Sequence, residues 1–368
     1  MKNKLTFLFL KKISPLLVFS PTSWILSCVA VLTSPFVGVF TNKPTKCFHQ
    51  PIKHFGMAIL LFFLLSQSSL AQELIVPRDT SYNISAAFKK VKKNYPTTDI
   101  SIVSSNSSNT INVEKEIVYK TIGRRKISAN IFYPKKKSST GYPVILAIHG
   151  GGWRTGDKKM MTPMAERLAA EGYIVVVPEY RLSPEAQFPA GVEDLYSALE
   201  WIGINAKKYS IDLNLVVVLG RSAGGQLATL IGTTYHKNTF RTSDENEPVR
   251  IAAIVDMDGI LAFKHPVSKE GDSAGKWLGG DYNSAKENWE KASALNHVDE
   301  KTPPTLFLAS KFPRFLAGHK EYMTQLKANG IFSEKKELND SPHGFWLFHP
   351  WYEPTIQYTL DFLDRVLK

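Results

Sequence analysis

The chain contains very little cysteine, and its first 71 residues contain no aspartate, glutamate or arginine. Cys28 and Cys47 are the only two thiols, and both lie in this N-terminal segment. The remaining residues therefore cannot form a disulfide framework or a cysteine-based metal site. A chain of this length can bury a full core without such cross-links.

The positive charge of the chain comes mostly from the same segment. The sequence has 45 basic and 33 acidic residues, and seven of the lysines lie in the first 71 residues. Without these seven lysines, the chain has 38 basic and 33 acidic residues. No stripe of Lys and Arg with interleaved aromatics is present, so we expect no nucleic-acid partner.

The N-terminal segment has the pattern of an export signal. An apolar run at 57–65 follows Lys53, and small residues at 69–71 precede Gln72. This predicts a leader over 1–71, cleaved after Ala71, and a periplasmic or secreted protein. The apolar run is too short for an ordinary transmembrane helix.

A signal peptide belongs at the N-terminus, so we interpret the stretch before this run as an over-extended translation start. One alternative is lipidation of Cys28, which follows Ile-Leu-Ser in a lipoprotein-like box. A membrane-anchored N-terminus is another.

Beyond the leader, we expect an N-terminal arm at 72–110 and one domain at 111–368. The arm is rich in Ser, Asn and Thr and has one short helix candidate. In the domain, two period-two segments precede alternating strand-like and helix-like segments, which predicts a mostly parallel sheet with helices on both faces. The expected strands are 113–119, 127–133, 144–148, 173–177, 215–219, 251–255, 305–309 and 332–338, and the expected helices are 160–171, 192–206, a helix from 226, 320–329 and 354–367.

One short turn has the pattern of a nucleophile. The segment 220–225 reads G-R-S-A-G-G, between the apolar run 215–219 and a helix-like segment. A serine between glycines at a strand-to-helix corner projects where a base can reach it. The motif alone is weak, because a plain glycine-rich loop has the same letters. We expect Ser222 to be the nucleophile because a second motif supports it.

That second motif is H-G-G-G-W at 149–153, directly after the apolar run 144–148. Glycines let consecutive backbone N–H groups point at a bound oxyanion, and acyl transfer needs such donors. Removing one such donor typically costs about 2.7–4 kcal/mol of transition-state stabilisation.

Four motifs in this order resemble those of the α/β-hydrolase superfamily. They are H-G-G-G-W at 149–153, Y-R-L-S-P-E at 180–185, F-P-A with E-D at 188–194, and G-R-S-A-G-G at 220–225. Within that superfamily, the chain is similar to hormone-sensitive-lipase-like and bacterial feruloyl/acetyl-esterase-like carboxylesterases. The similarity extends from about Val113 to the C-terminus and implies an α/β-hydrolase fold.

The resemblance also assigns roles within the glycine motifs. It implies that backbone N–H groups of Gly151, Gly152 and Ala223 hold the oxyanion. His149 is then structural and orients the glycine loop. No metal and no organic cofactor is implied.

In this fold a histidine base follows the nucleophile in the sequence. His343 is the best candidate, because it lies in a turn after the last expected strand, as the histidine of the resembled family does. His349 is the runner-up, and we expect it to pack among neighbouring aromatic residues instead.

The acid is where the chain departs from its resemblance. Related proteins usually have an aspartate after the strand at 305–309, but no carboxylate occurs between Lys301 and Lys320. Asp258, at the end of the preceding strand, is our preferred acid. Asp340 is an alternative, and another carboxylate or a Ser-His dyad also remains open.

Charge in the same loop bears on the substrate. Lys311, Arg314 and Lys320 cluster where the acid usually lies, and a cationic rim favours an anionic ester, since Arg grips a carboxylate bidentately. We expect Lys311, Arg314 and Trp153 to bind substrate. Segments 313–318 and 342–351 are similar to those of secreted bacterial esterases associated with pectin breakdown.

These features predict a serine carboxylesterase that removes methyl or acetyl groups from pectin-like polysaccharide or oligosaccharide, with no stable protein partner. A generic small-molecule carboxylesterase or lipase-like hydrolase is the alternative, and a catalytically dead glycan-binding module is a weaker one. Two groups of aromatic residues could bind a sugar ring or pack in the hydrophobic core, and we favour a role in the core. They are Phe345, Trp346, Phe348, Trp351 and Tyr352, and Trp277, Tyr282 and Trp289.

Overall fold

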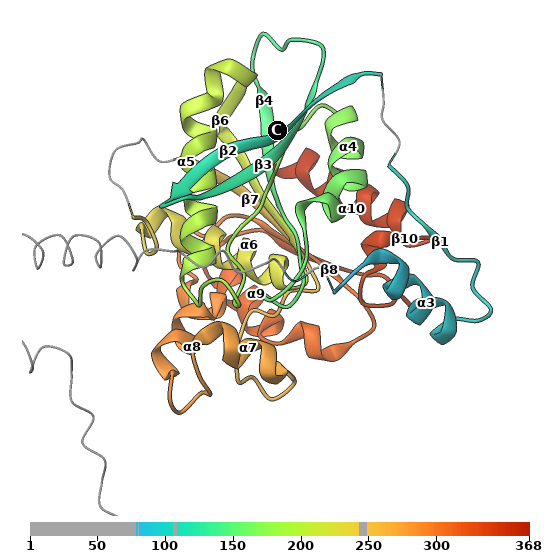
Figure 1. The fold of residues 1–368 in the computed structure, drawn as a ribbon, viewed down its shortest axis with the longest axis vertical. Coiled ribbons are helices and arrows are strands. Elements are labelled where there is room, and N and C mark those ends of the chain that lie inside the picture. Colours follow the sequence, from blue (N-terminus) through green and yellow to red (C-terminus); the bar gives the residue numbers. More distant parts are fainter. Residues whose placement is uncertain (1–78, 80, 106–108, 243–248) are drawn as a thin grey trace, which may run out of the picture. The chain divides into compact units, whose positions relative to one another are not determined.

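The computed structural model describes residues 79, 81–105, 109–242 and 249–368 (Figure 1), which all belong to one compact unit, Glu73–Lys368. The predicted leader, its cleavage after Ala71, and both cysteines lie outside the described residues. None of the helices within the described ranges has the length and apolar character needed to cross a membrane.

An eight-stranded sheet forms the centre, in the order β2-β3-β5-β4-β6-β7-β8-β9. β2 is antiparallel to β3, and β3 is antiparallel to β5, whereas all later neighbours are parallel. The prediction of a mostly parallel sheet opened by an antiparallel pair is thus confirmed. The strands are β2 (Ile111–Ile122), β3 (Arg125–Pro134), β4 (Tyr142–Ile148), β5 (Ile174–Pro178), β6 (Ile211–Arg221), β7 (Ile251–Met257), β8 (Thr305–Ala309) and β9 (Ser333–Glu337).

Helices cover both faces of this sheet (Figure 1). Alternate residues of one strand belong to different core clusters: Val144 and Leu146 face one layer, whereas Ile145 and Ala147 face the other. The first layer contains residues of α5, α6, α7, α8 and α9, and the second contains residues of α3, α4 and α10. Strands buried on both sides explain the continuous apolar runs in the sequence. The helices are α3 (Ile84–Asn94), α4 (Thr162–Ala170), α5 (Ala190–Tyr209), α6 (Ala223–Thr234), α7 (Gly271–Leu278), α8 (Lys286–Ala292), α9 (His319–Ala328) and α10 (Tyr352–Val366).

The register of the central strands brings three predicted site segments to one edge. Ile148 of β4 pairs with Gly220 of β6, and Gly220 pairs with Asp256 of β7. Because these strands are parallel, their following residues leave the sheet side by side. The glycine motif, the serine turn and Asp258 therefore meet at the carboxyl edge.

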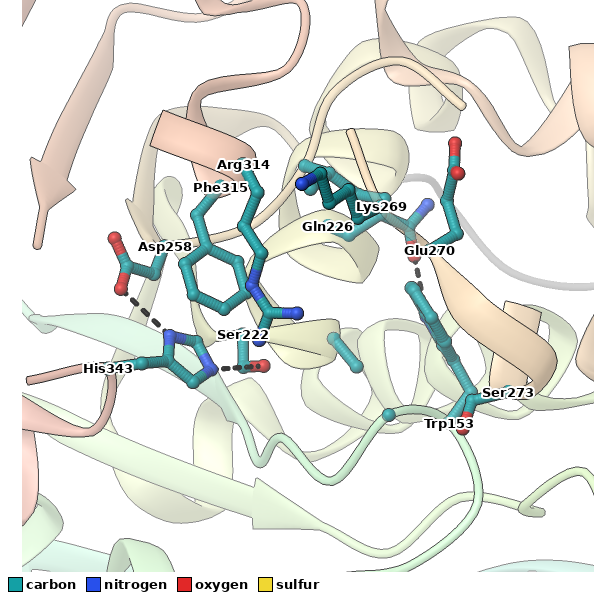
Figure 2. A pocket seen from close by; sticks show the side chains of 13 residues that line it. Trp153, Ser222, Gln226, Asp258, Lys269, Glu270, Ser273, Arg314, Phe315 and His343 are labelled. Carbon is teal, nitrogen blue, oxygen red and sulfur yellow. Dashed lines mark hydrogen bonds and ion pairs between the residues drawn. The ribbon is translucent and has the colours of Figure 1, made fainter. Parts of the chain in front are cut away.

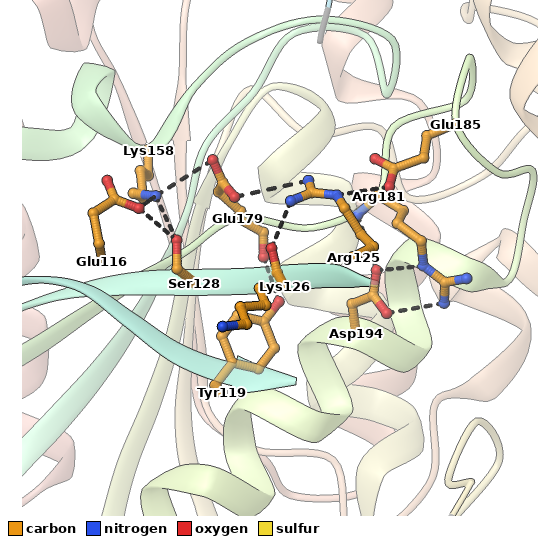
Figure 3. Close-up of polar contacts among 10 residues, drawn as sticks. All are labelled: Glu116, Tyr119, Arg125, Lys126, Ser128, Lys158, Glu179, Arg181, Glu185 and Asp194. Carbon is orange, nitrogen blue, oxygen red and sulfur yellow. Dashed lines mark hydrogen bonds and ion pairs between the residues drawn. The ribbon is translucent and has the colours of Figure 1, made fainter. Parts of the chain in front are cut away.

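An ionic cluster around a buried lysine attaches the β2–β3 hairpin to the segment after the glycine motif (Figure 3). Lys158 is only 2% exposed, and its Nζ lies 2.8 Å from Glu116 Oε2 and 3.3 Å from Glu179 Oε1. It also donates a hydrogen bond to Ser128 Oγ at 2.8 Å. These contacts fix the turn that leads from the glycine motif into α4.

The N-terminal arm contains a real helix, α3. Asn83 caps it, since Asn83 Oδ1 accepts a hydrogen bond from Ala86 N at 2.8 Å. The short strand β1 (Ser101–Ile102) then pairs with β10 (Phe348–His349) near the C-terminus. The arm is thereby attached to the segment that carries His343.

Candidate active site

Ser222 lies at the corner between β6, which ends at Arg221, and α6, which begins at Ala223. Its backbone has φ 54° and ψ −123°, a left-handed conformation that is strained for a residue with a side chain. A side chain at Gly220 would collide with the carbonyl oxygen of Gly224. The flanking glycines therefore allow the tight turn that pushes the serine hydroxyl outward.

Three side chains from separate segments form one hydrogen-bonded chain (Figure 2). His343 Nε2 lies 2.9 Å from Ser222 Oγ, and His343 Nδ1 lies 2.8 Å from Asp258 Oδ2. With its proton on Nδ1, the imidazole donates to Asp258 and accepts from the serine hydroxyl. The structure thus brings together the predicted nucleophile, base and preferred acid in the arrangement that activates a serine.

Asp258 is firmly held where β7 ends. It is 1% exposed, and its Oδ1 accepts a hydrogen bond from Ser310 N at 2.7 Å. Asp340, by contrast, has a 91% exposed side chain and pairs with Lys311 at 3.3 Å. Of the two named alternatives for the acid, the structure places Asp258 next to His343 and leaves Asp340 at the surface.

His349 does not approach the serine. It lies in β10, paired with Ser101, and its ring contacts Tyr352 edge-on with centroids 5.7 Å apart. Its expected packing among aromatic residues is therefore what the structure has. The nearby aromatic group at 345–352 is buried, so the core interpretation also holds for it.

The glycine motif lies beside Ser222. Gly152 and Ala223 line the same cavity as Ser222. Gly151 and Gly152 have φ 131° and 59°, conformations that favour glycine. A side chain at Gly150 would lie 3.0 Å from Ser222 Cβ. Glycine at position 150 therefore lets the motif pass close to the serine turn, and Gly151 is not among the residues that line the cavity.

His149 contacts this loop from the protein interior. It is fully buried and stacked on Tyr180, with ring centroids 4.6 Å apart. Its Nδ1 lies 2.8 Å from the Gly150 carbonyl oxygen. These contacts agree with the orienting role that the sequence predicted for His149.

The cavity at Ser222 has a volume of about 180 Å³. Trp153 forms part of its wall, stacked on Trp277 with centroids 4.9 Å apart, and donates Nε1 to Gln226 Oε1 at 2.9 Å. Trp277 is thus a core residue behind this wall, as we favoured from the sequence. The small volume limits the group that can sit next to the serine.

The predicted cationic rim is only partly present. Arg314 lines the cavity together with Phe315 and His343 (Figure 2). Lys311 differs from the prediction, because it pairs with Asp340 and its Nζ lies 4.5 Å from the Tyr95 ring centroid, outside the cavity wall. Lys320 lines a different depression.

The family model BD-FAE matches residues 129–312, which is half of the chain. The chain belongs to the BD-FAE family. The matched part includes Ser222, Asp258 and the glycine motif, whereas His343 follows it and α3 precedes it.

Several relatives of this BD-FAE chain are esterases or hydrolases by name. A putative α/β hydrolase of Acanthamoeba polyphaga mimivirus is 24% identical over 282 residues, 73% of this chain and 80% of the relative. Carboxylesterase NlhH of Mycobacterium tuberculosis is 34% identical over 110 residues, which cover 30% of this chain and 34% of the relative. The chain thus spans most of the first and about a third of the second.

The fold is that of solved esterases. Esterase B from Lactobacillus rhamnosis superposes with a TM-score of 0.59 at 19% identity, over 85% of this chain and 96% of that one. The predicted α/β-hydrolase fold is thus confirmed. Together with the named relatives, the BD-FAE match makes the chain an enzyme of the carboxylic ester hydrolase class.

Sequence reasoning on this BD-FAE chain missed several cavity residues. Gln226 follows the serine turn, and Lys269, Glu270 and Ser273 come from the segment before and within α7. Phe315 stacks on the His343 ring, with centroids 3.7 Å apart and 13° between the planes. No motif marks these residues; Phe315 alone had a signal, since it lies in the conspicuous 313–318 segment.

A buried pair lies beneath the acid. Asp256 Oδ1 accepts a hydrogen bond from Gly259 N at 2.8 Å, and His319 Nε2 donates to Gly259 O at 2.9 Å. Burial raises the pKa of Asp256 well above its usual value and lowers the pKa of His319 to about 4. Burial thus favours the uncharged form of both side chains, whose His319 Nε2 and Asp256 Oδ2 lie 3.7 Å apart, and both hold Gly259, the residue after Asp258.

Arg221 adds a buried cation next to the nucleophile. It is 2% exposed, its Nη2 donates to Met160 O at 3.0 Å, and its guanidinium lies 5.7 Å from the Trp346 ring centroid. Burial lowers the pKa of Arg221 to about 10, so it remains charged at neutral pH.

Proposed function

We propose that this protein is a secreted serine esterase that removes small ester groups, methyl or acetyl, from plant-type polysaccharide such as pectin. The observation that carries the chemistry is the hydrogen-bonded chain Ser222–His343–Asp258 at a cavity of about 180 Å³. Its three groups have the donors and acceptors that acyl transfer to serine requires.

In the first half of the reaction, His343 Nε2 takes the proton of Ser222 Oγ as that oxygen attacks the ester carbonyl carbon. Asp258 holds the imidazole in the required tautomer and stabilises the imidazolium that forms. The backbone N–H groups of Gly151, Gly152 and Ala223 stabilise the oxyanion.

In the second half, the imidazolium returns its proton to the leaving alcohol oxygen, and the bond between that oxygen and the acyl carbon breaks. Water then attacks the acyl-enzyme with His343 as the base, which releases the acid and restores Ser222. This chain supplies every group that these steps use.

Cavity size and charge support the substrate class. A volume of about 180 Å³ suits a methyl or acetyl group better than a long acyl chain. Arg314 lines this cavity, and no ion pair to it occurs among the described residues. A guanidinium available for a carboxylate is what an ester on an acidic polymer would need.

Secretion is the second part of the proposal. It rests on the apolar run 57–65 and the small residues before Gln72. N-terminal sequencing of the protein recovered from a bacterial host's periplasm or medium tests it: a new N-terminus at Gln72 supports export, and an uncleaved chain in the cytoplasm opposes it.

The test of the activity compares the protein with its Ser222→Ala variant. Both are incubated with methylated and with acetylated pectin, and released methanol and acetate are quantified. Serine-dependent release of either product supports the proposal and names the group removed. If neither is released while an aryl acetate is still cleaved, the generic carboxylesterase is the better assignment.

A further inference from the structure

A second cavity adjoins the one that contains Ser222. Its volume is about 370 Å³, and Arg314, Phe315 and His343 line both cavities. Its other wall is helix α3 with Tyr82 before it and Tyr95 after it. The space next to the His343 imidazole therefore continues to the N-terminal helix.

The α3 wall is part of the folded body. The Phe88 ring packs on Phe348 with centroids 6.0 Å apart, and Tyr95 packs edge-on against Trp351 at 5.5 Å. Val91 of the same helix is buried in the core. Since α3 precedes the family match at 129–312, the cavity that it closes is a feature of this chain beyond the family model.

The second cavity combines cations with exposed aromatic rings. Lys90 and Arg314 line it, and none of its described lining residues is acidic. Within the described part of the chain, neither cation forms an ion pair with a carboxylate. Tyr82 and Phe312 line it as well, and they are 40% and 38% exposed. Such a surface matches a ring-shaped ligand that carries a negative charge.

The position of His343 indicates which part of the substrate lies in the second cavity. Its imidazole must protonate the leaving alcohol oxygen when the acyl–oxygen bond breaks and the Ser222 ester has formed. The small cavity at Ser222 holds the acyl group, and the leaving alcohol departs past His343. The leaving alcohol is therefore the part nearest to the second cavity.

We infer that the cavity between α3 and the 312–315 loop binds a carboxylate-bearing sugar on the leaving-alcohol side of the substrate. The inference rests on the proposed function and makes it narrower: an acetyl group is removed from an acidic oligosaccharide whose sugar ring lies against Tyr82 and Phe312. Lys90 and Arg314 bind its carboxylate.

The test measures binding without requiring turnover of a sugar ester. The full-length protein hydrolyses 4-nitrophenyl acetate as a reporter, and trigalacturonate, which has no ester, is added as an inhibitor. Xylotriose is the neutral control. The variants are Lys90→Ala and the matched control Lys93→Ala, on the same helix but outside the cavity wall. Each inhibition constant is compared within one variant, so differences in reporter rate do not enter.

We expect competitive inhibition by trigalacturonate that weakens with added salt. Its inhibition constant should rise about tenfold in Lys90→Ala, as loss of one charge-assisted contact does, and stay constant in Lys93→Ala. Xylotriose should inhibit weakly and equally in all three proteins. No inhibition by trigalacturonate, equal inhibition by xylotriose, or equal effects of both substitutions overturns the inference.

These outcomes remain separate from those of the proposed function. If pectin releases no product but trigalacturonate inhibits through Lys90, the cavity binds an acidic sugar and the proposed reaction is wrong. If pectin is deacetylated and Lys90→Ala changes nothing, the reaction stands and the cavity has another role.

Discussion

At the scale of single residues, the assignment of the acid gives the sharpest prediction. Asp258→Asn should lower kcat for an aryl acetate by about 10⁴-fold, because the amide no longer holds the imidazole in the tautomer that accepts the serine proton. The hydrogen bond between Asp258 Oδ2 and His343 Nδ1 is 2.8 Å long. Steady-state kinetics at neutral pH measures the effect.

Asp340→Asn is the matched control for that substitution. The Asp340 side chain is 91% exposed and contacts Lys311 alone among charged groups of the described chain. We expect its kcat within about twofold of the parent protein, as for other surface changes. A comparable loss in both variants, or a loss in Asp340→Asn alone, would contradict the assignment.

Most of this residue-scale chemistry was predictable, because it depends on short motifs. The serine turn, the glycine motif and the Pro-His turn each carry their own local signal. Asp258 was harder, since only its position at a strand end indicated a role. Phe315 lies in the conspicuous 313–318 segment, but its stacking on His343 is a contact between segments far apart in the sequence. Lys90 has no local signal at all, because only the fold brings it to a cavity wall.

At the scale of elements, helices and strands with a local sequence signal could be predicted, whereas contacts that arise only in the folded chain could not. The buried strands β4, β6, β7 and β8 were predicted because continuous apolar runs are their direct signature. Helices α7 and α8 were not, because eight and seven residues are too few to show a clear period. The short helix α3 was expected, but its contact with the catalytic segment depends on the pairing of β1 with β10.

The ionic cluster at Lys158 provides a prediction about how elements are joined. Lys158→Met should lower the free energy of unfolding by about 2 kcal/mol, because Glu179, which is mostly buried, loses its nearest cation and keeps only Arg125 at 3.8 Å. The hairpin β2–β3 and the turn after the glycine motif would then be attached less firmly. Chemical denaturation with urea measures the change.

Lys159→Met is the control, because Lys159 is adjacent in sequence and exposed. Its free energy of unfolding should stay within about 0.5 kcal/mol of the parent value. If Lys158→Met were equally mild, the cluster would contribute nothing to stability despite its burial.

At the scale of the whole molecule, the buried pair Asp256 and His319 predicts how stability depends on pH. Burial raises the pKa of Asp256 and lowers the pKa of His319, so both shifts favour a folded pair that is uncharged overall and holds one proton. In the unfolded chain between about pH 4 and 6.5, aspartate is ionised and histidine is protonated, which is also one proton. Because the folded and unfolded states hold equal numbers of protons on these two groups, the pair does not make the free energy of unfolding depend on pH in this range.

Substituting either Asp256 or His319 should make the free energy of unfolding depend on pH in this range, with opposite signs for the two substitutions. In Asp256→Asn, folded His319 stays neutral down to its pKa of about 4 while the unfolded histidine takes up a proton below about pH 6.5. The unfolded state then binds more protons, so the free energy of unfolding falls as pH drops from 6.5 to 4, by about 3 kcal/mol at most.

In His319→Asn the folded state keeps the Asp256 proton that the unfolded chain has lost above about pH 4, so stability falls as pH rises instead. Urea unfolding of the parent protein and both variants at pH 4.5, 5.5 and 6.5 measures the slopes, taken as differences from the parent. Slopes of the same sign in the two variants would show that these groups do not share one proton. Opposite slopes would show that the folded pair holds one proton and no net charge, so that the clamp on Gly259 adds no net negative charge beside Asp258.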